Sequence, residues 1–122
     1  MKKDNKILNI SKAFAIRIIR LYQYLQEEKK EFVLSRQILR SGTSIGANVR
    51  ESVHAQSLDD FIYKLNISLK ESFETEYWIE LLYETEYINE QQFLSLISDN
   101  KEITATLTKI IKTSKTKNDV NN

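Results

Sequence analysis

The chain has 122 residues, enough for one domain with one hydrophobic core. Its 41% hydrophobic and 29% charged residues are ordinary for a globular protein, and no run approaches the roughly 20 apolar residues of a membrane-spanning helix, so we expect no membrane association. The absence of cysteine excludes disulfides, thiolate metal sites and a cysteine nucleophile, and it fits a cytoplasmic location.

Charge is unevenly distributed along the chain, although the net charge is only +1. Residues 1–40 carry ten Lys/Arg against four Asp/Glu, residues 41–100 carry three against eleven, and residues 101–122 carry five against two. Such segregation can steer a partner or join copies of the chain. The interpretation we favour is plainer: the solvated faces of different helices differ in sign.

The first two predicted helices show apolar residues at steps of three and four, the spacing of one helix face. The first extends from Ile7 to Leu25. Because Lys12 and Arg17 interrupt its apolar run, we interpret this segment as a helix and not as a signal peptide. A turn follows, and the second apolar stripe extends from Leu34 to Val53.

The third and fourth predicted helices have the same spacing and carry start signals. Ser57 is a candidate N-cap for a stripe that runs from Leu58 to Tyr83 and includes Glu76. Asn89 can cap a stripe that runs from Phe93 to Ile110. No segment alternates with period two, so we predict no strands.

Short connections between long helices force successive helices to run antiparallel. The sequence therefore predicts an all-α fold, a left-handed up-down-up-down four-helix bundle formed by residues 1–115. Residues 116–122 have nothing to bury, and we expect them to form a frayed tail.

Both glycines of the chain, Gly42 and Gly46, lie in the segment "RSGTSIGANVRES". The apolar stripe passes through it without a change of phase, which places both inside a helix at a cost of about 1 kcal/mol each relative to alanine. The segment lacks the G-x-x-x-x-G-K-[ST] pattern of a phosphate loop, and no strand precedes it. We therefore expect the glycines to permit close packing of another helix, so that alanine is tolerated at position 46 and leucine is not.

Two segments, "LSRQILRSGTSIGANVRES" and "DFIYKLNISLKESFETEYWIELL", resemble the small bacterial four-helix-bundle proteins called 23S rRNA-intervening-sequence proteins. The matching residues are Arg40, Ser44, Ile45, Asn48, Val49 and Glu51 in the first segment, and Leu65, Ile67, Ser68, Glu71, Glu74, Glu76 and Trp78 in the second. The resemblance covers roughly residues 8 to 110. One departure is Ser52, where many members carry glycine.

The resemblance implies a homopentameric ring of up-down four-helix bundles, in a family for which no enzymatic activity is established. A related branch, the accessory proteins of diversity-generating retroelements, forms basic pentamers that bind nucleic acid and a reverse transcriptase. This chain departs from that branch in its net charge of +1.

Catalytic, metal and cofactor sites are not expected. Glu51 and His54 form an E-x-x-H pair, but a di-iron bundle needs a second such pair, and His54 is the only histidine. The glutamates between residues 71 and 86 are candidates for acid–base chemistry, yet no nucleophile or oxyanion arrangement accompanies them.

A polar line on the second predicted helix is formed by Arg40, Ser44, Asn48 and Glu51, at steps of four, four and three. Glu76 lies on the predicted core stripe of the third helix and needs a partner, because a lone buried charge is costly. Arg40 and Asn48 are the natural partners. We interpret these five residues as a structural polar network that fixes helix register or a subunit contact, in preference to a ligand site.

Aromatic residues on the third predicted helix exceed what its core stripe can hold. Phe73, Tyr77 and Trp78 point around the helix, and such an excess favours a protein interface. Base stacking is the alternative, but it needs interleaved basic residues and this stretch is acidic. With the bundle periodicity, this excess leads us to expect a non-catalytic homo-oligomer that acts as a scaffold or adaptor, and the resemblance implies that it is a pentamer.

The alternative function is an RNA- or DNA-binding module. Its candidate contacts are Arg17 and Arg20, one turn apart on the first helix, and Lys101, Lys112 and Lys115 along one side of the fourth. Repeated around a ring, such basic patches strengthen one another, and phosphate binding weakens steeply with salt.

Overall fold

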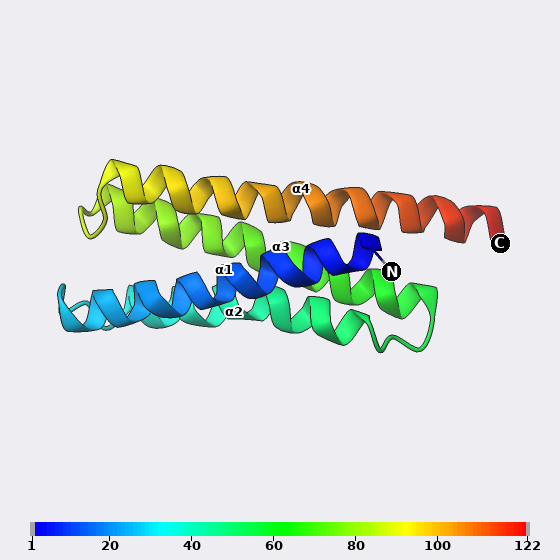
Figure 1. The fold of residues 1–122 in the computed structure, drawn as a ribbon, viewed down its shortest axis with the longest axis horizontal. Helices are drawn as coiled ribbons and strands as arrows, with labels where there is room; N and C mark the ends of the chain where they lie inside the picture. Colours follow the sequence, from blue (N-terminus) through cyan, green and yellow to red (C-terminus); the bar gives the residue numbers. More distant parts are fainter. Residues whose placement is uncertain (1, 122) are drawn as a thin grey trace.

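The structure is a computed structural model that describes residues 2–121, with the side chains of residues 6–117. Its elements are α1 (Lys2–Glu27), α2 (Leu34–Ser52), α3 (Leu58–Glu84) and α4 (Glu90–Asn121) (Figure 1). The described residues contain no strand, which confirms the prediction of an all-α protein.

The four helices lie lengthwise beside one another, and the chain turns back at each connection (Figure 1). Each helix contacts the next along the chain, and α1 also contacts α4. The contact between α1 and α4, called here the α1–α4 seam, is the least extensive of the four.

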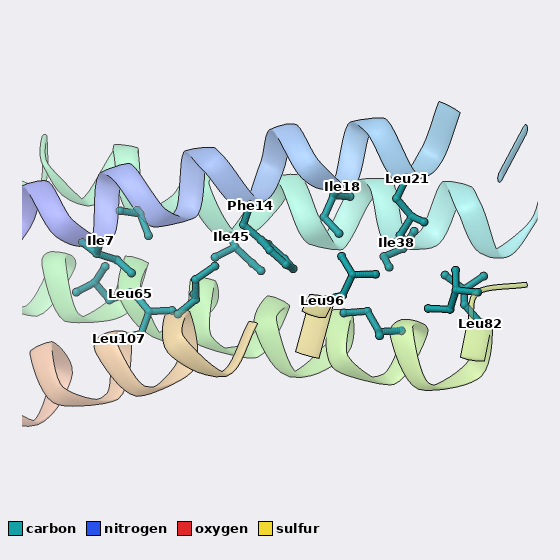
Figure 2. Close-up of a cluster of buried hydrophobic side chains, with 14 of the residues drawn as sticks. Ile7, Phe14, Ile18, Leu21, Ile38, Ile45, Leu65, Leu82, Leu96 and Leu107 are labelled. Carbon is teal, nitrogen blue, oxygen red and sulfur yellow. The ribbon is translucent and has the colours of Figure 1, made fainter. Parts of the chain in front are cut away.

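The core is built from one apolar row on each helix, and these rows meet between the helices (Figure 2). Its fully buried apolar side chains are Phe14, Ile18, Leu25, Ile38, Ile45, Val49, Leu65, Ile79, Leu82, Ile103 and Leu107. Burial of one such side chain stabilises a fold by about 1.5–3 kcal/mol. The four apolar rows together are therefore the main source of stability.

The core face of α3 differs from the predicted stripe. Thr75 is fully buried in the structure, whereas Glu76 is only partly buried, so the prediction that Glu76 lies on the core stripe is wrong. Thr75 Oγ1 donates to the carbonyl oxygen of Glu71 at 2.8 Å and lies 2.9 Å from Ser41 Oγ. A hydroxyl can satisfy itself in this way on the preceding turn, whereas a carboxylate at the same place would be buried at high cost.

Small polar side chains also fill the interfaces of α3 with α2 and α4. Ser68 Oγ donates to the carbonyl oxygen of Ile45 at 2.8 Å, and Asn100 Nδ2 donates to the carbonyl oxygen of Ser72, also at 2.8 Å. The amide oxygen Oδ1 of Asn100 is buried without a hydrogen-bond partner among the described residues. The hydrogen bonds of Ser68 and Asn100 link α3 to α2 and to α4.

Local signals start α3 and α4 as predicted. The backbone N–H of Asp60 donates to Ser57 Oγ at 3.1 Å. Asn89 and Gln92 form a reciprocal capping box, in which the backbone N–H of each donates to the side-chain oxygen of the other at 2.8 Å.

α2 begins differently, with a cap that the sequence analysis missed. Val33 at its N-cap has no side chain able to cap, and the carboxylate of Glu31 takes that role. Glu31 accepts backbone N–H hydrogen bonds from Val33, Leu34 and Ser35 at 3.1, 2.9 and 2.7 Å. An anion at the positive end of the helix dipole is favourable, so Glu31 anchors the start of α2.

The two positive φ angles of the described non-glycine residues lie in the connections that follow α1 and α3. They belong to Lys30 (φ 54°) and Glu86 (φ 69°), whereas neither glycine has a positive φ. After α3 the chain forms a Schellman motif, with Tyr87 N–H bonded to the Leu82 carbonyl oxygen at 2.8 Å. The glycines are thus absent from the positions where helix ends usually use them.

α4 continues to Asn121, so the backbone of residues 116–121 is helical where the sequence suggested a frayed tail. Residue 122 lies outside the described residues. The domain boundary at residue 115 stays a prediction.

Candidate interaction surface

α1 packs closely against α2 at the two glycines. A Cβ atom built at Gly42 would lie 2.8 Å from side-chain carbons of Ile18, and one built at Gly46 would lie 3.3 Å from the backbone oxygen of Ser11. The first distance is far below the about 3.5–4.0 Å of a relaxed contact between carbon atoms, and the second is a tight approach of a carbon atom to a backbone oxygen. Gly42 therefore admits a side chain of α1, and Gly46 admits its backbone.

Arg40 on α2 joins two carboxylates of α3 on the outer side of the bundle. Its Nη1 lies 2.9 Å from Glu71 Oε2, and its Nη2 contacts Glu74 Oε2. Glu74 Oε2 also accepts a hydrogen bond from Trp78 Nε1 at 3.0 Å. We call Arg40, Glu71, Glu74 and Trp78 the Arg40 cluster.

Hydrogen bonding sets the electrostatics of the Arg40 cluster. The hydrogen bond from Trp78, reinforced by Arg40, lowers the pKa of Glu74 although partial burial opposes this. The hydrogen bond to Glu74 and the charges of both carboxylates raise the pKa of Arg40. The contacts of the cluster therefore favour the charged forms of Arg40 and Glu74, and they give the indole N–H of Trp78 a hydrogen-bond acceptor.

The predicted network had other partners for Arg40. Ser44 Oγ donates to the carbonyl oxygen of Arg40 at 2.6 Å, and Asn48 Nδ2 donates to that of Ser44 at 2.9 Å, so both bond their own helix. Glu51 forms an ion pair with Lys64 at 3.1 Å. These residues lie along one side of α2, but only Arg40 reaches the carboxylates of the cluster.

The side chain of Glu76 makes no hydrogen bond or ion pair with any residue whose side chain the structure describes. It is therefore not a partner of Arg40 or Asn48. The reason is geometric. Residues 74 and 76 are about 200° apart around a helix, so Glu74 faces outward beside α2 while Glu76 lies on the side towards α4.

An exposed row follows the outer face of α3. Its members, spaced to share one face, are Tyr63, Lys70, Phe73, Tyr77 and Glu84, here called the α3 strip. Phe73 and Tyr77 are each 53% exposed, and Tyr63 is 61% exposed. Trp78 is partly buried beside the strip, with its ring centroid 5.2 Å from that of Tyr77. The three predicted interface residues thus lie together, and Trp78 joins them to the Arg40 cluster.

The candidate nucleic-acid contacts fall on two sides of the molecule. Arg17 forms an ion pair with Asp99 at 2.8 Å and donates to Ser95 Oγ, so its charge is already matched. Arg20 donates to Gln23 at 3.3 Å. One side of α4 carries three exposed lysines, Lys101, Lys112 and Lys115. Lys101 lies about 200° around the helix from Asp99, so the lysines face away from the side that Arg17 contacts.

Glu51 and His54 are both exposed, and His54 lies beyond the end of α2. Within the described part of the chain, no group of three or more His, Cys, Asp or Glu side chains is placed to hold a metal ion. No helix of the described chain is long and apolar enough to cross a bilayer.

Two hollows accompany these surfaces. One, of about 320 Å³, is lined by apolar side chains such as Ile7, Phe61 and Ile110, and its polar side chains are serines. The other, of about 410 Å³, runs along the outer side of the α1–α2 contact. We call it the α1–α2 groove; its lining includes Lys12, Ala15, Thr43, Gly46, Ala47 and Arg50.

Comparison with known proteins places the chain in a family. Residues 3–109 match the family model described as 23S rRNA-intervening sequence protein. The chain belongs to this family. A solved structure of a protein of unknown function from the S23 ribosomal protein family of Bacteroides thetaiotaomicron VPI-5482 is 59% identical and has a TM-score of 0.89, covering 90% of this chain and 98% of that one. No curated protein matches significantly.

Membership of the 23S rRNA-intervening sequence protein family confirms the predicted family resemblance, while the link to retroelement accessory proteins stays a prediction. Among the residues that carried the resemblance, Arg40, Glu71, Glu74 and Trp78 meet in the Arg40 cluster. Arg40 is 31 residues from Glu71 and 34 residues from Glu74 in the sequence, so no local sequence pattern could predict these contacts.

Proposed function

We propose that the protein is a non-catalytic scaffold or adaptor of the cytoplasm, which assembles as a homopentameric ring of left-handed, antiparallel four-helix bundles. The observation that carries the proposal is the exposure of Phe73 and Tyr77 beside the Arg40 cluster. The family model and its relative support the fold without naming a reaction.

The energetic argument concerns exposed aromatic rings. Phe73 and Tyr77 leave about half of their surface in water, and aromatic residues are enriched at the buried centres of protein interfaces. Trp78 donates a hydrogen bond to Glu74, and its ring centroid lies 5.2 Å from that of Tyr77. Tyrosine and tryptophan side chains have few rotatable bonds, so they supply contact area at a low cost in conformational entropy.

Sedimentation equilibrium at micromolar concentration tests the proposal. We expect a mass five times the 14.4 kDa of the chain. The double variant Phe73→Asp/Tyr77→Asp should fall to the monomer mass, whereas Val33→Asp, at an exposed valine outside the α3 strip, should assemble like the parent. A monomeric parent would refute self-assembly.

The second candidate is nucleic-acid binding, and the observation that favours it is the exposed lysine row of α4. A gel-shift series with structured RNA and with duplex DNA would show retardation at low salt that is lost as salt rises. Lys112→Ala/Lys115→Ala should weaken retardation, whereas Lys29→Ala should not. No retardation of the parent at low salt would remove this candidate.

A further inference from the structure

The α1–α2 groove is a basic surface with a small-residue floor. Ala15, Gly46 and Ala47 leave the space, and Lys12 and Arg50 stand at its edges. Neither cation forms an ion pair with any residue whose side chain the structure describes. The groove therefore offers two unmatched positive charges beside an apolar hollow.

Apolar side chains extend the groove along α1. Ile16 and Ile19 follow Lys12 at steps of four and seven, which places all three on one helix face. Ile16 is 50% exposed and Ile19 is 40% exposed, which is unusual for isoleucine. The groove and these two residues form one surface that no side chain of residues 6–117 covers.

The α3 strip and its neighbouring glutamates contrast with this surface in side-chain size and in charge. It presents bulky rings, Phe73 and Tyr77, where the groove presents small residues. Glu80 and Glu84 are exposed one and two turns beyond Tyr77. α3 as a whole carries seven acidic against two basic side chains, one of them Lys70 in the strip.

Symmetry and charge together decide between two ways of pairing. The groove has the cations Lys12 and Arg50 at its edges, and none of its lining residues is acidic. Pairing of one α3 strip with the strip of another copy is isologous and closes at two copies, so it cannot build the proposed ring of five. Pairing of the strip with the groove opposes unlike charges and fills the hollow.

We propose that copies of the chain associate head to tail, with the α3 strip of one copy seated in the α1–α2 groove of the next. This inference rests on the self-assembly proposed above and names its two surfaces. The pairing is heterologous, so every copy uses both surfaces, and rotation from copy to copy closes a ring or continues as a filament.

A mixing experiment separates head-to-tail from strip-to-strip pairing. The strip variant is Phe73→Asp/Tyr77→Asp, and the groove variant is Lys12→Glu/Ala47→Glu/Arg50→Glu; all five positions are exposed, and circular dichroism verifies the fold. Each variant alone should be monomeric. An equimolar mixture should give a dimer of twice the 14.4 kDa chain mass, because one intact strip and one intact groove remain.

Other outcomes overturn the inference. A groove variant that assembles like the parent, or a mixture that stays monomeric while the parent assembles, would exclude strip-in-groove pairing but leave self-assembly intact. A monomeric parent would remove the proposed function itself. As a second route, adding Glu80→Lys/Glu84→Lys to the groove variant should restore assembly, and failure to do so would count against the pairing.

Discussion

Gly42 lies so close to Ile18 that a Cβ atom at position 42 would stand 2.8 Å from both Cγ1 and Cγ2 of the isoleucine. Ile18 is fully buried and β-branched, so its side chain has no free space or flexible end with which to yield. The contact between α1 and α2 at this point therefore requires glycine.

Gly42→Ala should lower the free energy of unfolding by about 1–3 kcal/mol, because overpacking of the core outweighs the helix propensity of alanine. Urea denaturation measures the difference. At Gly46 the built Cβ meets the Ser11 backbone oxygen at 3.3 Å, so alanine should change stability little and leucine should destabilise. A Gly42→Ala variant as stable as the parent would refute the close-packing explanation.

Glu31→Gln should reduce stability at neutral pH by about 1–2 kcal/mol, because Glu31 caps α2. Burial alone would raise the pKa of Glu31, but the three backbone N–H donors outweigh it and lower this pKa. The carboxylate therefore stabilises the fold fully above the unfolded-state pKa of about 4.3, and this contribution is lost as pH falls through the folded-state pKa.

Denaturation of the parent and of Glu31→Gln between pH 3 and 7 checks this capping role. The stability difference should be largest near pH 7 and shrink in acid. Glu28→Gln, at an exposed position in the same connection, should follow the parent at every pH. A difference that stayed constant with pH would show that ionised Glu31 is not the cap.

Glu86→Gly should raise the free energy of unfolding by roughly 0.5–1 kcal/mol, because the left-handed backbone at position 86 strains any residue with a Cβ atom. Glu86→Ala removes the same charge and keeps the strain, so it serves as the control and should bring no such gain. Equal thermal midpoints for both variants would contradict this account of the Schellman motif.

Asn100→Asp should destabilise the protein by about 3 kcal/mol or more at neutral pH, because it puts a carboxylate at a fully buried position. The charged side chain can no longer donate to the Ser72 carbonyl oxygen, and repulsion replaces that hydrogen bond. The loss should diminish in acid, where the aspartate takes up a proton. Asn9→Asp, on the exposed face of α1, should cost little, and equal losses for both would refute the argument.

Local signals made much of the fold predictable from the sequence. The apolar steps through Phe14 and Ile18 gave α1 its core face, and the caps Ser57 and Asn89 marked two helix starts, because each signal lies within about four residues. The Glu31 cap was not predicted because Glu31 lies two residues before the N-cap position, Val33, and no apolar or S-x-x-E pattern marks it.

The rotation of α3 was harder to predict for a physical reason. Its outer face carries Phe73 and Tyr77 while its inner face carries Ser72 and Thr75, so hydrophobicity alone does not tell inside from outside. That ambiguity led to the wrong prediction that Glu76 lies in the core. It also hid the partners of Arg40, because Glu71 and Glu74 face α2 only once α3 has its observed rotation.

The contact pattern of the helices has a consequence for folding kinetics. Three of the four helix contacts join neighbours along the chain, across connections of only a few residues. Proteins dominated by such local contacts have low contact order and fold in about microseconds to milliseconds. The α1–α4 seam alone joins the first helix to the last, so we expect the pairing of Arg17 with Asp99 to form late in folding.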